Sequence, residues 1–218
     1  KPDLEGDDKI FNGALDNALG VAAMIAAAEA AVAAPPRRSI IFASVTAEEG
    51  GLKGSTAFVE SPPVPLRQIV GNVNIDSPQS FGLTRDIGAI GLEMSSLGAL
   101  FAEVAADCGA RAVGDPNPNA GSFYRSDQVN FAKAGIPALY LQRGTEFVTP
   151  LDFDADELRL RNYHQVTDEI LPEWDLAGIE RDMRILYETA RRAANAEDQP
   201  RWVAGNEFEE EWKALYGR

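Results

Sequence analysis

Four short segments of the chain carry side chains that bind metals or move protons. Asp16 begins an apolar helix-like run, Glu48 and Glu49 follow an apolar stretch, Asp76 follows another, and His164 lies in a polar segment. One imidazole with several carboxylates suits a hydrolytic zinc site with an open water position. We therefore expect a metal-dependent hydrolase, with these residues gathered where buried strands end.

Each of these side chains also has a purely structural interpretation. Asp16 has the position of a helix N-cap, and Asp76 that of a turn aspartate. Two adjacent glutamates on a turn are commonly just solvated, and a lone histidine is commonly a surface residue. Adjacent side chains point in different directions, so one of Glu48 and Glu49 can bind a metal while the other acts as general base.

Other chemistries fit the sequence less well. Ser55 does not lie in a G-x-S-x-G elbow, and there is no Walker or dinucleotide-binding motif. A glycosidase using Glu48 with Asp76 is conceivable, but adjacent glutamates with a downstream histidine fit a metal better. Asp168, four residues after His164, is placed to orient the imidazole ring.

The elements that must position these residues alternate between strands and helices. We expect strands over residues 39–46, 68–75 and 136–141, with an irregular segment over 143–161. Residues 16–33 are apolar on nearly all faces, which predicts a mostly buried helix. Further helices are expected over 54–59, 97–108, 176–194 and 207–215. This alternation predicts an α/β fold with helices on both faces of the sheet.

Length and composition suit one globular domain spanning residues 1–218. Apolar residues make up 45% and charged residues 25% of the chain. Lys plus Arg is 20 and Asp plus Glu is 34, a formal charge of −14. That charge disfavours binding to nucleic acid or anionic lipid. The longest apolar stretch, 21–34, is too short for membrane insertion, and the single Cys108 cannot form an intrachain disulfide.

Six segments together resemble the bacterial zinc aminopeptidases of metallopeptidase clan MH, family 28. The matching segments occur in the family's order, and they are residues 10–20, 46–55, 72–76, 123–127, 131–138 and 163–168. The resemblance implies a mixed, mostly parallel central sheet flanked by helices. It also implies release of the N-terminal residue from a peptide or small aminoacyl substrate.

The resemblance gives each candidate a role around two Zn²⁺ ions. Asp16 would bridge both ions, and Glu48 would be the general base. Glu49 and His164 would complete one zinc site, and Asp76 would bind the other zinc. The parent protein would be secreted or periplasmic.

The sequence departs from the family in its zinc ligands. The family has a further zinc-binding histidine in an upstream His-x-Asp motif, and none of the fifteen residues before Asp16 is histidine. Gln128 also stands where relatives often have histidine. We therefore expect a chain truncated at its N-terminus and lacking the first strands, with one zinc or none and impaired activity. The uncovered flank of the sheet would favour a homo-oligomer.

Two alternatives remain open. The missing histidine favours a non-catalytic relative that uses the same fold for binding or assembly. A glutaminyl-cyclase-like reaction is also compatible with Asp16, Glu48 and Glu49. Replacing Glu48 by glutamine distinguishes a catalytic from a non-catalytic protein.

Overall fold

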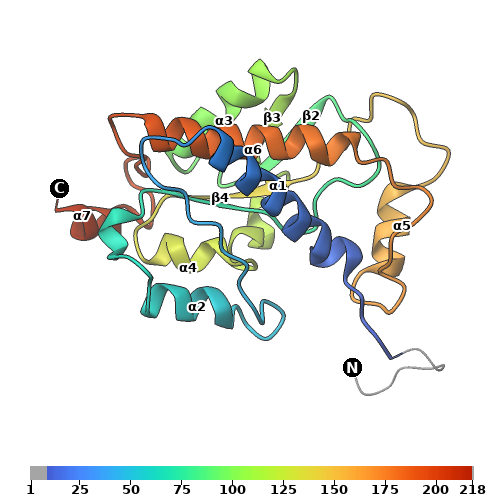
Figure 1. Ribbon diagram of the computed structural model, residues 1–218, viewed down its shortest axis with the longest axis horizontal. Coiled ribbons are helices and arrows are strands. Elements are labelled where there is room, and N and C mark those ends of the chain that lie inside the picture. The colour runs from blue at the N-terminus through green and yellow to red at the C-terminus, as the bar shows by residue number, and fades with distance from the viewer. Residues whose placement is uncertain (1–8, 218) are drawn as a thin grey trace.

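A four-stranded sheet forms the centre of the computed structural model, which describes residues 9–217 (Figure 1). Its strands are β1 (Asn72–Asn74), β2 (Asp86–Ile90), β3 (Arg111–Val113) and β4 (Ala138–Gln142), in the order β1-β4-β2-β3. β4 runs parallel to β1 and antiparallel to β2, while β2 and β3 are parallel. The mixed, mostly parallel sheet implied by the resemblance is confirmed.

Helices pack on both faces of this sheet. In Figure 1, α3 and α6 lie on one side of the sheet, and α2 and α4 lie on the other. The α-helices are α1 (Leu19–Ala33), α2 (Lys53–Glu60), α3 (Ser96–Asp107), α4 (Gln128–Lys133), α5 (Ala155–Asn162), α6 (Ala177–Asn195) and α7 (Glu209–Tyr216). The α/β fold predicted from the alternation of elements is therefore confirmed.

The side chains of β4 show how the sheet divides the core. Leu139 and Leu141 belong to a buried cluster that includes residues of α3 and α6. Ala138 and Tyr140 contact a second cluster, formed with α4 and the C-terminal segment. Successive side chains of a strand point to opposite faces, so this alternation places one core on each side of β4.

The first long helix differs from its prediction. A helix does cover most of residues 16–33, but among the residues of α1 only Gly20, Ala27 and Ala31 are buried. The expectation of a mostly buried helix is wrong, because α1 packs against α6 and leaves the rest of its surface uncovered. By length and composition alone, Ala14–Ala33 could cross a membrane, a test that core helices and signal sequences also pass.

Residues 39–46 do not form the predicted inner strand. They belong to no strand within residues 9–217, although their apolar, β-branched sequence favours one. β1 is an edge strand, and residues 40–47 and 72–76 line the same cavity of about 570 Å³. The prediction is wrong because a strand needs a paired neighbour, and the described residues place a cavity there.

Other elements were missed or shortened. β2, β3 and α4 were not predicted, and the segment 143–161, expected to be irregular, contains most of α5. The strand expected over 68–75 is reduced to β1 and follows a 3₁₀ turn at Leu66–Gln68. The short strands carry too few residues for a recognisable alternation of polar and apolar side chains.

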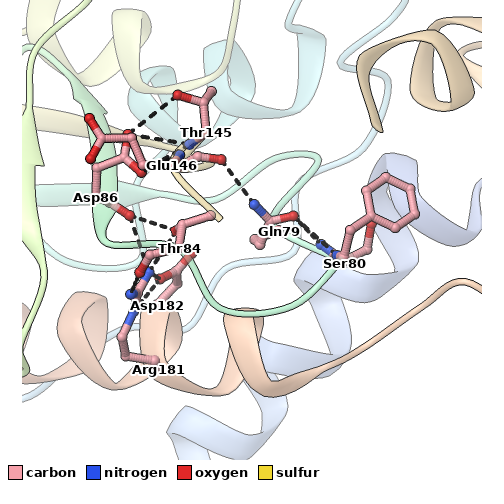
Figure 2. A network of polar contacts seen from close by, with 10 residues as sticks. Gln79, Ser80, Thr84, Asp86, Thr145, Glu146, Arg181 and Asp182 are labelled. Carbon is pink, nitrogen blue, oxygen red and sulfur yellow. Dashed lines mark hydrogen bonds and ion pairs between the residues drawn. The ribbon is translucent and has the colours of Figure 1, made fainter. Parts of the chain in front are cut away.

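A partly buried polar network ties α6 to the sheet (Figure 2). The Asp86 carboxylate accepts hydrogen bonds from the backbone N–H groups of Thr145 and Glu146, at 3.0 and 2.9 Å. Arg181 donates to Thr84 and to the fully buried carboxylate of Asp182. These contacts hold α6 in position, so that its apolar side chains pack into the core cluster that includes Leu139 and Leu141.

Candidate metal centre

Asp16 enters the site from an irregular turn of helix that precedes α1. It lies in the π-helical turn Ala14–Ala18, with non-helical φ and ψ of −115° and 86°. α1 begins at Leu19, so Asp16 is not the N-cap of that helix. The backbone N–H groups of Leu15 and Asp16 donate to the Asp168 carboxylate, at 2.9 and 3.0 Å. Asp168, expected to orient the imidazole, thus holds the backbone of Asp16.

Glu48 and Glu49 lie on a tight turn that leads into α2. The turn begins at Ala47, whose φ of 56° is left-handed. The N–H groups of Gly51 and Leu52 donate to the Glu48 carbonyl oxygen, at 3.0 and 2.9 Å. This backbone arrangement fixes the turn while both carboxylates remain available to a ligand.

His164 follows α5 and meets the two carboxylates. Its ring stacks on Tyr163, with centroids 3.7 Å apart and planes inclined by 25°. His164 Nε2 lies 3.2 Å from Asp16 Oδ2 and also contacts Glu49 Oε1. Donor atoms of Asp16, Glu49 and His164 all lie within 4.8 Å of one another. Two carboxylates and one imidazole can hold a divalent ion such as Zn²⁺ and leave a position for water.

Asp76 lies beside this group of three, at the end of β1. Its carboxylate accepts a hydrogen bond from Ser126 Oγ at 3.2 Å and lies near the carboxyl group of Asp16, whose charge acts on it. Burial, followed by repulsion from Asp16, raises the pKa of Asp76 to about 6. Asp76 is thus adjacent to the donor atoms but outside the group that converges within 4.8 Å.

Glu48 has the protonation behaviour of a base poised near neutral pH. Burial raises the pKa of Glu48 to about 7, with further contributions from Asp76, Glu49 and Asp127. Glu48 lines the 570 Å³ cavity together with Asp16 and the other carboxylates. A carboxylate with a pKa near the working pH can accept and return a proton efficiently.

Sequence reasoning missed the polar residues that support these carboxylates. Ser126 and Asp127 were noted only as part of a matching segment, and Ser55 only as an unsuitable nucleophile. Ser55 is fully buried, and its hydroxyl donates to the Asp127 carboxylate at 2.5 Å. Burial raises the pKa of Asp127. The only signal in the sequence was the Ser126-Asp127 pair inside one of the matching segments.

Comparisons with known proteins support the same family. Peptidase family M28 matches residues 3–190. An aminopeptidase from Aneurinibacillus sp. strain AM-1 has a TM-score of 0.63 and 20% identity, and the match covers 86% of this chain and 41% of that one. BSAP, a zinc aminopeptidase from Bacillus subtilis, has a TM-score of 0.65 and 21% identity, covering 88% and 45%. The Legionella pneumophila LapA aminopeptidase has a TM-score of 0.58 and 18% identity, covering 88% and 50%.

The family model and the solved structures support different conclusions. No curated protein matches the sequence. At about 20% identity, the solved structures establish the fold, and this chain spans half of their length or less. The family match extends over most of the 218 residues. The chain belongs to peptidase family M28.

Proposed function

We propose that this domain is a zinc-dependent aminopeptidase in which Asp16, Glu49 and His164 hold the metal and Glu48 is the general base. The observation that carries the proposal is the convergence of those three donors at a cavity that Asp16, Glu48 and Glu49 all line. The names of the structural relatives, which are aminopeptidases, support the substrate class. Peptides or small aminoacyl compounds are the substrates.

The chain's own residues carry the proton chemistry. A bound zinc ion supplies a Lewis acid and lowers the pKa of water at the site. Glu48 accepts a proton as water attacks the peptide carbonyl, and it returns that proton to the leaving nitrogen as the C–N bond breaks. Asp76 lies next to Asp16 and is the candidate ligand for a second ion. We expect one zinc ion to be held tightly by Asp16, Glu49 and His164. A second ion, with Asp76 and Asp16 as its ligands, should bind more weakly.

Metal content tests the proposal directly. After dialysis against trace zinc, we expect about one zinc per chain in the wild-type protein, because three protein ligands suffice for a catalytic site. Asp16→Ala and His164→Ala each remove a ligand and should abolish retention. Glu180→Ala is a matched control, since Glu180 is an exposed carboxylate on α6 and should leave the metal content unchanged.

Activity tests the role of Glu48 separately. Glu48→Gln should retain zinc while its cleavage of aminoacyl-nitroanilides falls by about 10²- to 10⁴-fold, the usual effect of losing a general base. A zinc-loaded wild-type chain without activity would instead favour the non-catalytic alternative. Loss of zinc retention in Glu48→Gln would contradict the division of roles between Glu48 and Glu49.

We also propose the domain organisation, the localisation and the binding partners of the protein. Residues 1–218 form a single zinc-peptidase-like domain, and the parent protein is secreted or periplasmic. The formal charge of −14 supports the absence of nucleic-acid binding. The exposed apolar surface of α1 supports association between copies of the chain.

A further inference from the structure

A buried cluster of polar side chains joins α2 to α4 beside the cavity of the candidate metal centre. Ser55 on α2 has no exposed surface, and Asp127, directly before α4, is 8% exposed. The Ser55 hydroxyl donates to Asp127 Oδ1 at 2.5 Å. Asn130 on α4 donates to Ser55 Oγ at 2.8 Å and reaches the Leu52 carbonyl oxygen at 3.3 Å. The two helices are therefore held together at the first turn of α2.

That first turn of α2 is rigidly connected to the turn that carries Glu48. The Gly54 N–H donates to the Thr46 carbonyl oxygen at 2.9 Å, and the Leu52 N–H donates to the Glu48 carbonyl oxygen at 2.9 Å. A Cβ atom on Gly54 would lie 2.4 Å from backbone atoms of Thr46, so the backbones meet at a distance only glycine allows. A shift of Ser55 is thereby transmitted to Glu48 and its neighbour Glu49.

The same end of α4 also holds Asp76. Ser126, the residue before Asp127, donates to Asp76 Oδ2 at 3.2 Å. Asn74 on β1 donates to Ser126 Oγ at 3.0 Å and to Gln128 Oε1 at 3.1 Å. Two consecutive residues thus connect to opposite acidic groups of the cavity. Ser126 contacts Asp76 directly, and Asp127 is linked to the Glu48–Glu49 turn through Ser55 on α2.

We propose that residues 126–130 act as a clamp that sets the separation between the Glu48–Glu49 turn and Asp76. Ser55 and Asp127 are positioning residues in this clamp, because they act through the turn. Within residues 9–217, the side-chain hydrogen bonds of Ser55 join it to Asp127, Asn130 and the Leu52 carbonyl oxygen, and not to a candidate metal ligand. The inference rests on the proposed function, since the separation matters only if Glu48 and the metal ligands act together. Outer contacts of this kind commonly contribute 10- to 100-fold to metal affinity or activity.

Hydrogen exchange tests the clamp without any metal. In metal-free protein, Ser55→Ala should accelerate exchange of the amides of residues 50–54 by roughly tenfold, the effect of one lost buried hydrogen bond. Ser61→Ala is the matched control, because Ser61 is an exposed serine at the far end of α2. Unchanged exchange in Ser55→Ala would overturn the proposal, whatever the zinc measurements show.

Zinc affinity and steady-state kinetics test the consequence for the site. Ser55→Ala should weaken zinc binding by about 10- to 100-fold and lower kcat with little change in KM. Asp127→Asn keeps an oxygen that can accept the Ser55 hydrogen bond, so it should restore most of what Asp127→Ala loses. A merely structural contact would lower the Tm of these variants without changing zinc affinity in the folded protein.

The two tests separate failure of the clamp from failure of the proposed function. If the wild-type chain binds no zinc, the aminopeptidase proposal fails, while the exchange experiment still decides whether α4 holds the turn. If Ser55→Ala does not fold, Asn130→Ala gives the same comparison from a half-buried position. Normal zinc affinity and kcat in folded Ser55→Ala and Asn130→Ala would overturn the clamp.

Discussion

The helices α1 and α6 pack against each other but relate differently to solvent. α1 is apolar except for Glu29, yet Ile25 is 55% exposed and Val32 is 81% exposed. α6 is strongly amphipathic and buries eight of its residues, among them Ile185 and Leu186, against the sheet and α3. Apolar content alone therefore does not predict burial. An amphipathic pattern specifies which face is covered, whereas an all-apolar helix requires partners on every side.

The largest expected effect compares one isoleucine from each helix. Ile185→Ala should lower the free energy of unfolding by about 2–5 kcal/mol, because Ile185 is fully buried and leaves a cavity. Ile25→Ala should change it by about 0.5 kcal/mol or less, as for other exposed positions. Urea denaturation of both variants measures the difference. A large cost for Ile25→Ala would show that α1 is covered in solution.

The second prediction, of intermediate size, concerns Asp182 on α6, whose buried carboxyl group should make the free energy of unfolding depend on pH. Burial raises the pKa of Asp182 to about 6, although Arg181 opposes the shift. Unfolding lets this carboxyl lose its proton above about pH 4, so its contribution to stability is present at pH 4 and is lost as the pH rises through 6. Two pKa units correspond to roughly 3 kcal/mol at most. Relative to wild type, Asp182→Asn should gain stability between pH 4 and 7, and parallel curves would contradict the shift.

The smallest expected effect on folding concerns the exposed face of α1. Val32→Lys should change the free energy of unfolding by about 0.5 kcal/mol or less, because Val32 contributes little burial. The same change should reduce self-association, which light scattering at increasing protein concentration would measure. Val203→Lys provides a control at a 45% exposed position outside α1. Equal effects of both substitutions would argue against a specific role for α1 in association.

Much of the fold was predictable from local sequence patterns. The helix expected over 176–194 agrees with α6 to within about a residue at each end, and the polar and apolar faces of α6 are distinct. The strand expected at 39–46 failed because its apolar composition describes a preference, while pairing depends on a neighbour elsewhere in the chain. The prediction that α1 is mostly buried was wrong for a related reason, because burial depends on neighbouring elements and not on apolar composition alone.

The candidate ligands were predictable, but their support was not. Asp16, Glu49 and His164 were identified from residue types and family resemblance, and the structure brings these three together. The contacts of Asp168 with the backbone of Asp16, and of Ser55 with Asp127, join residues far apart in the chain. Such contacts depend on tertiary packing, and the spacing of residues along a single sequence does not reveal them.

His164 is the one histidine among 218 residues, and it lies in the candidate site. In an NMR spectrum, its imidazole therefore gives a single set of histidine ring nitrogen and carbon-bound proton resonances. These resonances can be assigned to His164 without mutagenesis. Chemical modification of histidine would likewise report on this position alone. A polyhistidine purification tag would destroy that advantage and would add competing metal ligands, so a tag of another chemistry is the better choice for this protein.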